Sequence, residues 1–294
     1  PWVGADSERL REFTANYYNC MRRLDDGVGM LLEELEKSGV ADDTLIIYIG
    51  DHGAQFSRGK CSVYEAGLRV PFIVHWRGRI KGGQVREELV STLDIMPTLC
   101  GVAGVEAAEN LVGYDLAPLL AGEVPADWRE FSFGFTTGAA PAIFCLQHSV
   151  RDRRWKLISS PLAGETNLSA KAYVEGYNSH FAGGTRAGEI AAAPEYVRLA
   201  YSRFLKPPRY ELYDLEKDPY EWLDLAGDAE HSETLERLIQ ALGGWQEATR
   251  DPFADGELLR EFVERQKEKS DLSYRKDKSF RWPYLDKFPK AMDR

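Results

Sequence analysis

The sequence lacks three features that would place it in a familiar class. Its four cysteines include no C-x-x-C pair, which excludes the common zinc frameworks and small disulfide scaffolds. No apolar run approaches the roughly 20 residues that span a bilayer, so we expect no membrane span. Basic residues are also scarce, since 37 Lys and Arg face 47 Asp and Glu and leave a net charge of −10. We therefore expect no nucleic-acid partner, because phosphate binding needs a basic surface.

The first 125 residues alternate helical and strand patterns. Apolar residues recur every three or four positions over residues 6–38, which predicts a long amphipathic helix that ends at Gly39. The apolar, β-branched run at 44–49 predicts a central strand covered on both faces, and 70–76 predicts a second strand. Residues 92–103 again have a helical pattern. This succession is typical of an α/β fold with an open sheet flanked by helices.

The pattern changes after residue 125. Short strand patterns at 144–150, 155–159 and 210–215 precede an amphipathic helix at 232–249. They predict a smaller antiparallel sheet with a packed helix. We expect 163–194 to form a long surface loop, because it shows little periodicity, and we expect the charged, aromatic tail to wrap over the surface. At ~150 residues per domain, 294 residues suggest about two domains, here 1–125 and 126–254, followed by the tail at 255–294.

Three short motifs in this chain carry little information. Residues 53–60 have five residues between their glycines, where a P-loop has four. Cys145 and Arg151 have the C-x5-R spacing of a cysteine phosphatase, but the five residues between them contain no glycine and alternate like a strand. Asn167 begins a glycosylation sequon, which is frequent by chance.

The strongest local signal for chemistry is Gly50-Asp51-His52-Gly53, directly after the strand at 44–49. Ligands of open α/β sheets bind beyond the carboxyl ends of strands, so Asp51 and His52 are candidate ligands of one metal ion. Lys60 follows in the same loop and could bind an anionic oxygen. The alternatives are a plain strand-ending turn and a solvated lysine.

Several motifs resemble the sulfatase family of the alkaline-phosphatase-like superfamily, and they follow one another in the order of that family. The resemblance extends over about residues 10–255. It rests on Asp51-His52-Gly53, Gly59-Lys60, residues 64–71, Trp76-Arg77-Gly78, residues 90–98, residues 113–120, Glu211-Leu212-Tyr213-Asp214-Leu215, Asp218-Pro219 and Glu221. The fold that it implies is the C-terminal half of the sulfatase fold, with 1–125 as part of a large mixed sheet.

The resemblance also implies an activity and its cofactors. In this family a divalent cation, usually calcium, is held by an acidic pair from the N-terminal half and by a second pair that Asp51 and His52 match. Lys60 matches the lysine that binds the sulfate and assists the leaving oxygen. The nucleophile of the family is a formylglycine made in a C-x-P-S-R motif, and this sequence contains no such motif. We therefore expect an N-terminal half that supplies the formylglycine, either upstream or as a second chain, and we expect this chain to be inactive alone.

The later motifs are similar to the heparan N-sulfatase, or sulfamidase, branch of the family. Residues 209–214 and 245–253 carry that similarity. It makes Asp251 a candidate to contact the sugar, against the alternative of a helix-terminating turn, and His180 a second candidate for substrate contact. The sequence thus predicts hydrolysis of a sulfate ester or sulfamate, and the resemblance suggests N-sulfoglucosamine of heparan-type glycosaminoglycans as the substrate.

Two alternatives stay open at this point. One is a phosphodiesterase or phosphonate hydrolase of the same superfamily, which the upstream nucleophile would distinguish. The other is a relative that binds an anionic sugar without turnover. The resemblance suggests a periplasmic, secreted or lysosomal protein, whereas the sequence itself leaves the compartment unknown.

Overall fold

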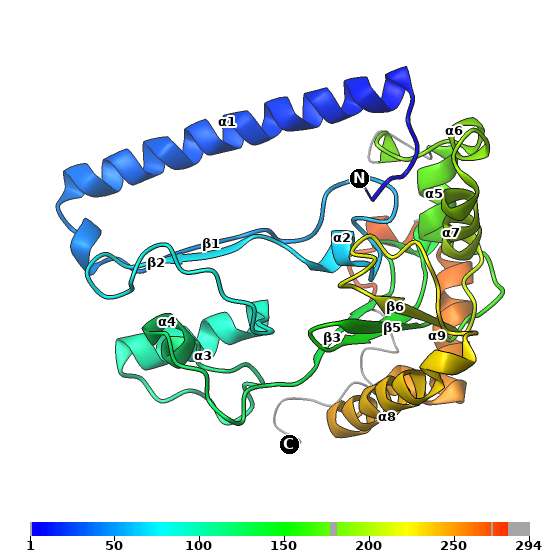
Figure 1. The fold of residues 1–294 in the computed structure, drawn as a ribbon. Coiled ribbons are helices and arrows are strands. Elements are labelled where there is room, and N and C mark those ends of the chain that lie inside the picture. Colours follow the sequence, from blue (N-terminus) through cyan, green and yellow to red (C-terminus); the bar gives the residue numbers. More distant parts are fainter. Residues whose placement is uncertain (1, 177–180, 272, 282–294) are drawn as a thin grey trace.

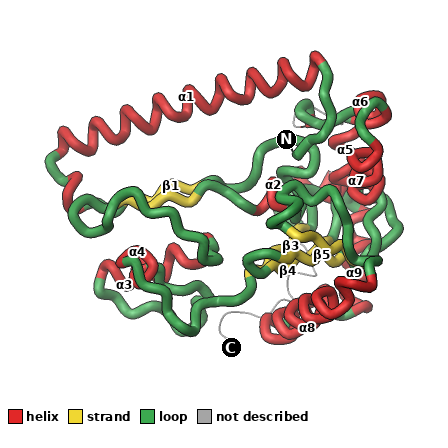
Figure 2. The backbone as a smooth tube through the Cα atoms, in the orientation of Figure 1, coloured by secondary structure: helices red, strands yellow, loops and turns green. Residues whose placement is uncertain are grey.

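A computed structural model describes residues 2–176, 181–271 and 273–281 of the chain (Figure 1). The α-helices and β-strands among these residues are shown in Figures 1 and 2. In chain order they are α1 (Glu8–Ser38), β1 (Ile46–Ile49), α2 (Glu65–Leu68), β2 (Phe72–His75), α3 (Ile95–Ala103), α4 (Ala117–Ala121), β3 (Ser132–Thr136), β4 (Gln147–Arg151), β5 (Trp155–Ser159), α5 (Leu168–Glu175), α6 (Ala187–Ala191), α7 (Glu195–Leu205), β6 (Tyr210–Asp214), α8 (Ser232–Thr249) and α9 (Gly256–Glu268).

The long helix α1 confirms the expectation for residues 6–38. Ser7 caps its N-terminus by accepting a hydrogen bond from the Leu10 backbone N, and Gly39 ends it in a left-handed conformation at φ 74°. Leu10 is its one buried residue. The helix therefore extends along one side of the molecule with most of its apolar face uncovered (Figure 1).

β1 and β2 form an antiparallel pair in which Ile46 faces His75 and Ile49 faces Phe72. In the described part of the chain this sheet has two strands. The expectation that residues 44–49 are buried on both faces is wrong for this chain, because all four β1 residues are partly or fully exposed. On β2, Ile73 is 58% exposed. The apolar run is present, but no other described strand pairs with it.

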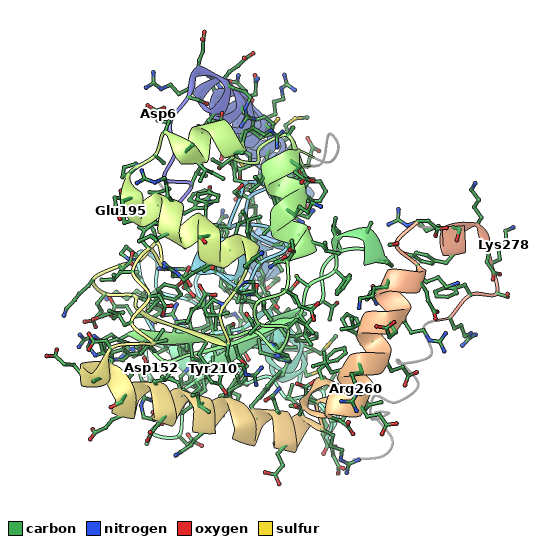
Figure 3. All side chains as sticks on the ribbon, turned by 90° about the vertical axis from the view of Figure 1, so that its right-hand side faces the viewer. Asp6, Asp152, Glu195, Tyr210, Arg260 and Lys278 are labelled. Carbon is green, nitrogen blue, oxygen red and sulfur yellow. The ribbon has the colours of Figure 1, made fainter. Side chains whose placement is uncertain are left out.

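The second sheet is antiparallel, with strand order β3-β4-β5-β6. The helix α8 covers one face, where Leu238 and Leu242 pack against Val150, Leu157 and Leu212. It runs along the lower edge of Figure 3. The helices α5 and α7 cover the opposite face, with a buried core that joins them to the sheet through Ile158 and Tyr213. The predicted smaller sheet with a packed helix is therefore confirmed.

The expectation of a surface loop over 163–194 is wrong. This segment contains α5 and α6, and α5 contributes Ala170, Ala172 and Tyr173 to the core. Two of these three core residues are alanines, which give no apolar periodicity in the sequence.

The tail that begins at residue 255 also contributes to the core. It starts with α9, whose Phe262 and Val263 pack against Phe144 and Phe253. None of the described helices is both long and apolar enough to cross a bilayer.

Candidate active site

The carboxyl end of β1 leads directly into Asp51 and His52. His52 Nε2 lies 3.3 Å from Asp51 Oδ2, and the Asp51 carboxylate is 86% exposed. His52 Nδ1 lies 2.9 Å from the carbonyl oxygen of Gly53. Because that oxygen can only accept, the contact favours the tautomer with the proton on Nδ1. The lone pair of Nε2 is then free to face the same space as the carboxylate.

This pair fits two positions in the coordination shell of a divalent cation. Oxygen ligands of calcium lie at 2.3–2.6 Å, so two adjacent ligands at a right angle are about 3.4 Å apart. The observed separation of 3.3 Å agrees with that value. No group of three or more candidate ligand side chains occurs within the described ranges. The assignment of Asp51 and His52 as metal ligands stays a prediction, and it requires further ligands from outside the described residues.

The loop between β1 and α2 is packed too tightly to accept side chains at its glycines. A Cβ on Gly53 would lie 1.8 Å from the carbonyl oxygen of Ala66, and one on Gly59 would lie 2.3 Å from that of Ala54. The Gly53 N donates to Gly67 O at 3.0 Å, and the Lys60 N donates to Ala54 O at 3.0 Å. The chain thus folds back so that the Lys60 backbone contacts Ala54, which is only two residues after His52.

Lys60 lies between two strained positions of this loop. Arg58 and Cys61 have φ values of 62° and 66°, the left-handed region that non-glycine residues rarely adopt. Among the residues that the structure describes, no carboxylate pairs with the Lys60 ammonium. The expectation that Lys60 binds an anionic oxygen stays a prediction.

A buried charge cluster lies against the start of α2, and sequence reasoning missed it. Lys156 Nζ lies 2.9 Å from Glu65 Oε1 and 3.0 Å from Glu221 Oε1. Arg151 also pairs with Glu65. Burial opposes ionisation of Glu65, but Lys156 and Arg151 outweigh it and hold its pKa below the usual value. The available signal was Lys156 itself, a charged residue within the otherwise apolar strand pattern of β5.

Asp251 lies at the turn that follows α8, as the alternative of a helix-terminating turn has it, and its contact with a sugar stays a prediction. Its carboxylate accepts a hydrogen bond from Gln246 Nε2 at 2.7 Å and pairs with His148 Nε2 at 2.9 Å. Its side chain is only 8% exposed. In the described part of the chain it makes these contacts rather than any with Asp51, His52 or Lys60. His180, the other candidate for substrate contact, lies outside the described residues.

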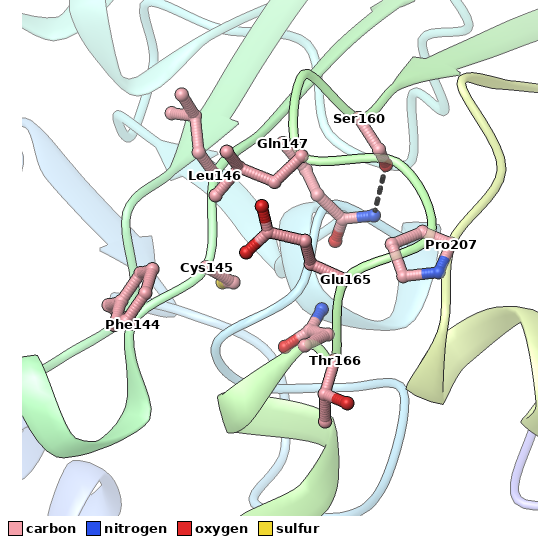
Figure 4. A pocket seen from close by; sticks show the side chains of 10 residues that line it. Phe144, Cys145, Leu146, Gln147, Ser160, Glu165, Thr166 and Pro207 are labelled. Atoms are coloured by element: carbon pink, nitrogen blue, oxygen red, sulfur yellow. Dashed lines mark hydrogen bonds between the residues drawn. The ribbon is translucent and has the colours of Figure 1, made fainter. Parts of the chain in front are cut away.

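The surroundings of Cys145 do not suit a phosphatase nucleophile. The thiol is buried in a cavity of about 20 Å³ lined by Gln147, Ser160 and Glu165 among others (Figure 4). Burial raises its pKa to about 12, so the thiolate is rare at neutral pH. Arg151, the arginine of the C-x5-R spacing, forms an ion pair with Glu65.

Comparison with known proteins agrees with the motifs around this strand end. Residues 2–105 match the family model described as Sulfatase. The human N-sulphoglucosamine sulphohydrolase is 30% identical over 271 residues, which are 86% of this chain and 51% of that protein. The solved structure of a 2-O GAG sulfatase, 21% identical, superposes with a TM-score of 0.64 over 86% of this chain and 46% of its own. A structure in complex with its substrate D-glucosamine-2-N,6-O-disulfate is 26% identical, with a TM-score of 0.54 over 77% of this chain and 39% of its own.

These likenesses confirm the predicted fold class, because structures of sulfatases cover most of the chain. The chain spans about half the length of the curated relatives that it matches. The chain is therefore similar to proteins of the sulfatase family, whose model its residues 2–105 match.

Proposed function

We propose that this chain provides the Asp51, His52 and Lys60 side of the active site of a metal-dependent sulfatase. The observation that carries the proposal is the pair of side-chain atoms at the end of β1, 3.3 Å apart. It is followed in the same packed loop by a lysine that pairs with no carboxylate among the described residues. Its nucleophile, a formylglycine, would come from an N-terminal half that this sequence does not include. The family match of residues 2–105 supports this assignment.

Each of the three residues has a distinct part in this proposal. Asp51 Oδ2 and His52 Nε2 would hold the divalent cation, with calcium as the expected ion. When bound, that cation neutralises negative charge on the sulfate. The Lys60 ammonium binds a sulfate oxygen and stabilises the charge that develops on the leaving atom. The contact between His52 Nδ1 and Gly53 O fixes the imidazole so that Nε2 faces the cation.

The substrate that we propose is an N-sulfated glucosamine residue of a heparan-type glycosaminoglycan. Two relatives support this choice: one is named an N-sulphoglucosamine sulphohydrolase, and another is solved with a glucosamine N,O-disulfate. The reaction would then break an S–N bond. A sulfate ester, in which an S–O bond breaks, is the other member of the same class.

A desulfation panel on the complete protein tests this proposal. It compares N-sulfoglucosamine with glucosamine 6-O-sulfate and with a phosphonate monoester, and it measures release of sulfate or alcohol. We expect the fastest turnover with the sulfamate. Release from O-sulfates alone would remove the sulfamidase assignment and keep the sulfatase one. Turnover of the phosphonate alone would favour the phosphonate hydrolase, and cation binding without turnover would favour a sugar-binding relative.

A further inference from the structure

Three segments that are distant in the sequence meet at one buried charge cluster. We call Glu65, Lys156 and Glu221 the charge triad. They come from the start of α2, from β5 and from the turn after β6, and their side chains are 11%, 1% and 2% exposed. Burying three charges is costly unless each is paired, so the triad constrains how these segments meet.

The triad is connected to the loop that carries the candidate site. Glu221 Oε2 accepts a hydrogen bond from the Glu65 backbone N at 2.7 Å, at the first residue of α2. The carbonyl oxygen of Glu221 accepts a second one from Arg58 Nη2 at 2.6 Å. Glu221 therefore holds the loop at two points, one on each side of Lys60.

Arg58 itself is fixed from several sides. Its guanidinium lies between the rings of Tyr64, 4.6 Å from the centroid, and Trp222, 4.2 Å from the centroid. The residue is 1% exposed. Arg58, Cys61 and Glu221 are three of the four non-glycine residues with positive φ in the described chain. Such conformations persist only where surrounding contacts determine them.

We propose that Glu221 and Lys156 are positioning residues that set the place of Lys60 through this loop. The inference rests on the proposed function. Lys156 pairs with both Glu65 and Glu221, and Arg151 supplies a second positive charge to Glu65. Glu221 then holds the Arg58 guanidinium through its backbone carbonyl and the first amide of α2 through its side chain. The loop is thereby attached on both sides of Lys60, which restricts the positions that Lys60 can take relative to His52. The triad thus couples the four-stranded sheet to the candidate site on the other sheet.

The variant Glu221→Gln in the complete protein tests this proposal. It keeps the side-chain shape and an acceptor oxygen but removes the charge that pairs with Lys156. The matched control is Asp94→Asn, a carboxylate that is also fully buried and paired, with Arg129, and that caps the segment before α3 instead of the loop. Lys156→Arg keeps the positive charge and serves as the conservative variant.

Two measurements are made on folded protein, at a temperature below the unfolding of every variant. The first is hydrogen–deuterium exchange of peptides within residues 50–64. We expect at least tenfold faster exchange in Glu221→Gln and unchanged exchange in Asp94→Asn. The second is steady-state hydrolysis of N-sulfoglucosamine. We expect kcat to fall at least tenfold in Glu221→Gln with less than a twofold change in KM. The kcat of Lys156→Arg should lie closer to that of the parent.

The two measurements separate the two proposals. If exchange rises only in Glu221→Gln while the parent hydrolyses no sulfated sugar, the proposed function fails and the positioning of the loop stands. If exchange in residues 50–64 is unchanged in Glu221→Gln, or rises equally in Asp94→Asn, the positioning role is overturned. A fall of kcat that is equal in both variants overturns it as well.

Discussion

Among single residues, Asp51 is the one whose loss has the most direct expected effect. It supplies one of the two ligand atoms that this chain offers to a cation. We expect Asp51→Ala in the complete protein to bind calcium more than ~100-fold more weakly, because even residues that only support a ligand cost 10–100-fold. Elemental analysis and calorimetric titration with calcium measure this. The control is Asp43→Ala, an exposed aspartate at the other end of β1, and unchanged calcium content in Asp51→Ala would remove Asp51 from the site.

Asp251 gives a prediction about pH. Burial disfavours its charge, but hydrogen bonds from His148 and Gln246 outweigh this and lower its pKa below the ordinary value. A carboxylate whose pKa is lower in the folded state stabilises the fold above the unfolded pKa of about 3.9, and this stabilisation disappears as the pH falls through the folded value. We expect Asp251→Asn to lower the free energy of unfolding by about 1–3 kcal/mol at pH 7. The stability of this variant should then fall less than that of the parent as the pH is lowered.

Thermal unfolding of the complete protein between pH 7 and pH 2 checks this prediction. Asp26→Asn, which changes an exposed carboxylate on α1, is the control and should follow the parent. If the melting temperatures of Asp251→Asn and the parent differ by the same amount at every pH, the carboxylate is not the group that titrates.

At the level of elements, we expect a Gly→Ala substitution to have opposite effects on stability in two places. One is the loop between β1 and α2, and the other is the helix α1. Gly53→Ala places a Cβ 1.8 Å from a backbone oxygen, so we expect a loss of about 3 kcal/mol or more in stability. Gly27→Ala, inside α1, meets nothing within 4 Å and should raise stability by ~0.5–1 kcal/mol, because alanine favours a helix. Denaturant unfolding of both variants measures the difference. Equal effects of the two substitutions would show that the packing of the loop is not as tight as described.

The same elements show what could be predicted from the sequence. Apolar residues at helical spacing over 6–38 and a glycine stop were sufficient for α1, and the strand end with Asp51, His52 and Lys60 was found from its position after an apolar run. The helix α5 was missed because it is short and buries small residues such as Ala170, and α6 was missed because it has five residues and buries none of them. The charge triad was missed because pairing between positions 65, 156 and 221 is not visible in any local pattern.

For the whole molecule, the exposed surface predicts how the chain behaves by itself. Its accessible area is 17442 Å², whereas a compact monomer of 33.2 kDa exposes about 12,600 Å². Most of the uncovered large apolar residues lie before residue 125, and those on α1, on the two-stranded sheet and on α3 include Tyr18, Met30, Leu31, Ile73 and Met96. We therefore expect residues 1–294 expressed alone to associate or aggregate and to release no sulfate.

Light scattering, thermal unfolding and a sulfate-release assay on residues 1–294 measure this. Co-expression with an N-terminal half from the same gene is the control, and it should restore a soluble species. A soluble monomer that unfolds cooperatively without a partner would contradict the prediction, and turnover by it would contradict the proposed division of the active site.

The anchoring of α1 also has a consequence for the time course of synthesis. Its N-terminal turn is held by Arg9, whose guanidinium pairs with Glu189, 180 residues further along the chain. A ribosome that adds ~5–20 residues each second needs about 10–40 s to reach that partner. For about 8–30 s of this interval, after Ser38 has been added, the whole of α1 has been made and the partner of Arg9 has not. A nascent chain of this protein should therefore bind chaperones that recognise apolar helices. Pairing of Arg9 with Glu189 alone should not release them, because most of the apolar side of α1 stays uncovered after that pairing.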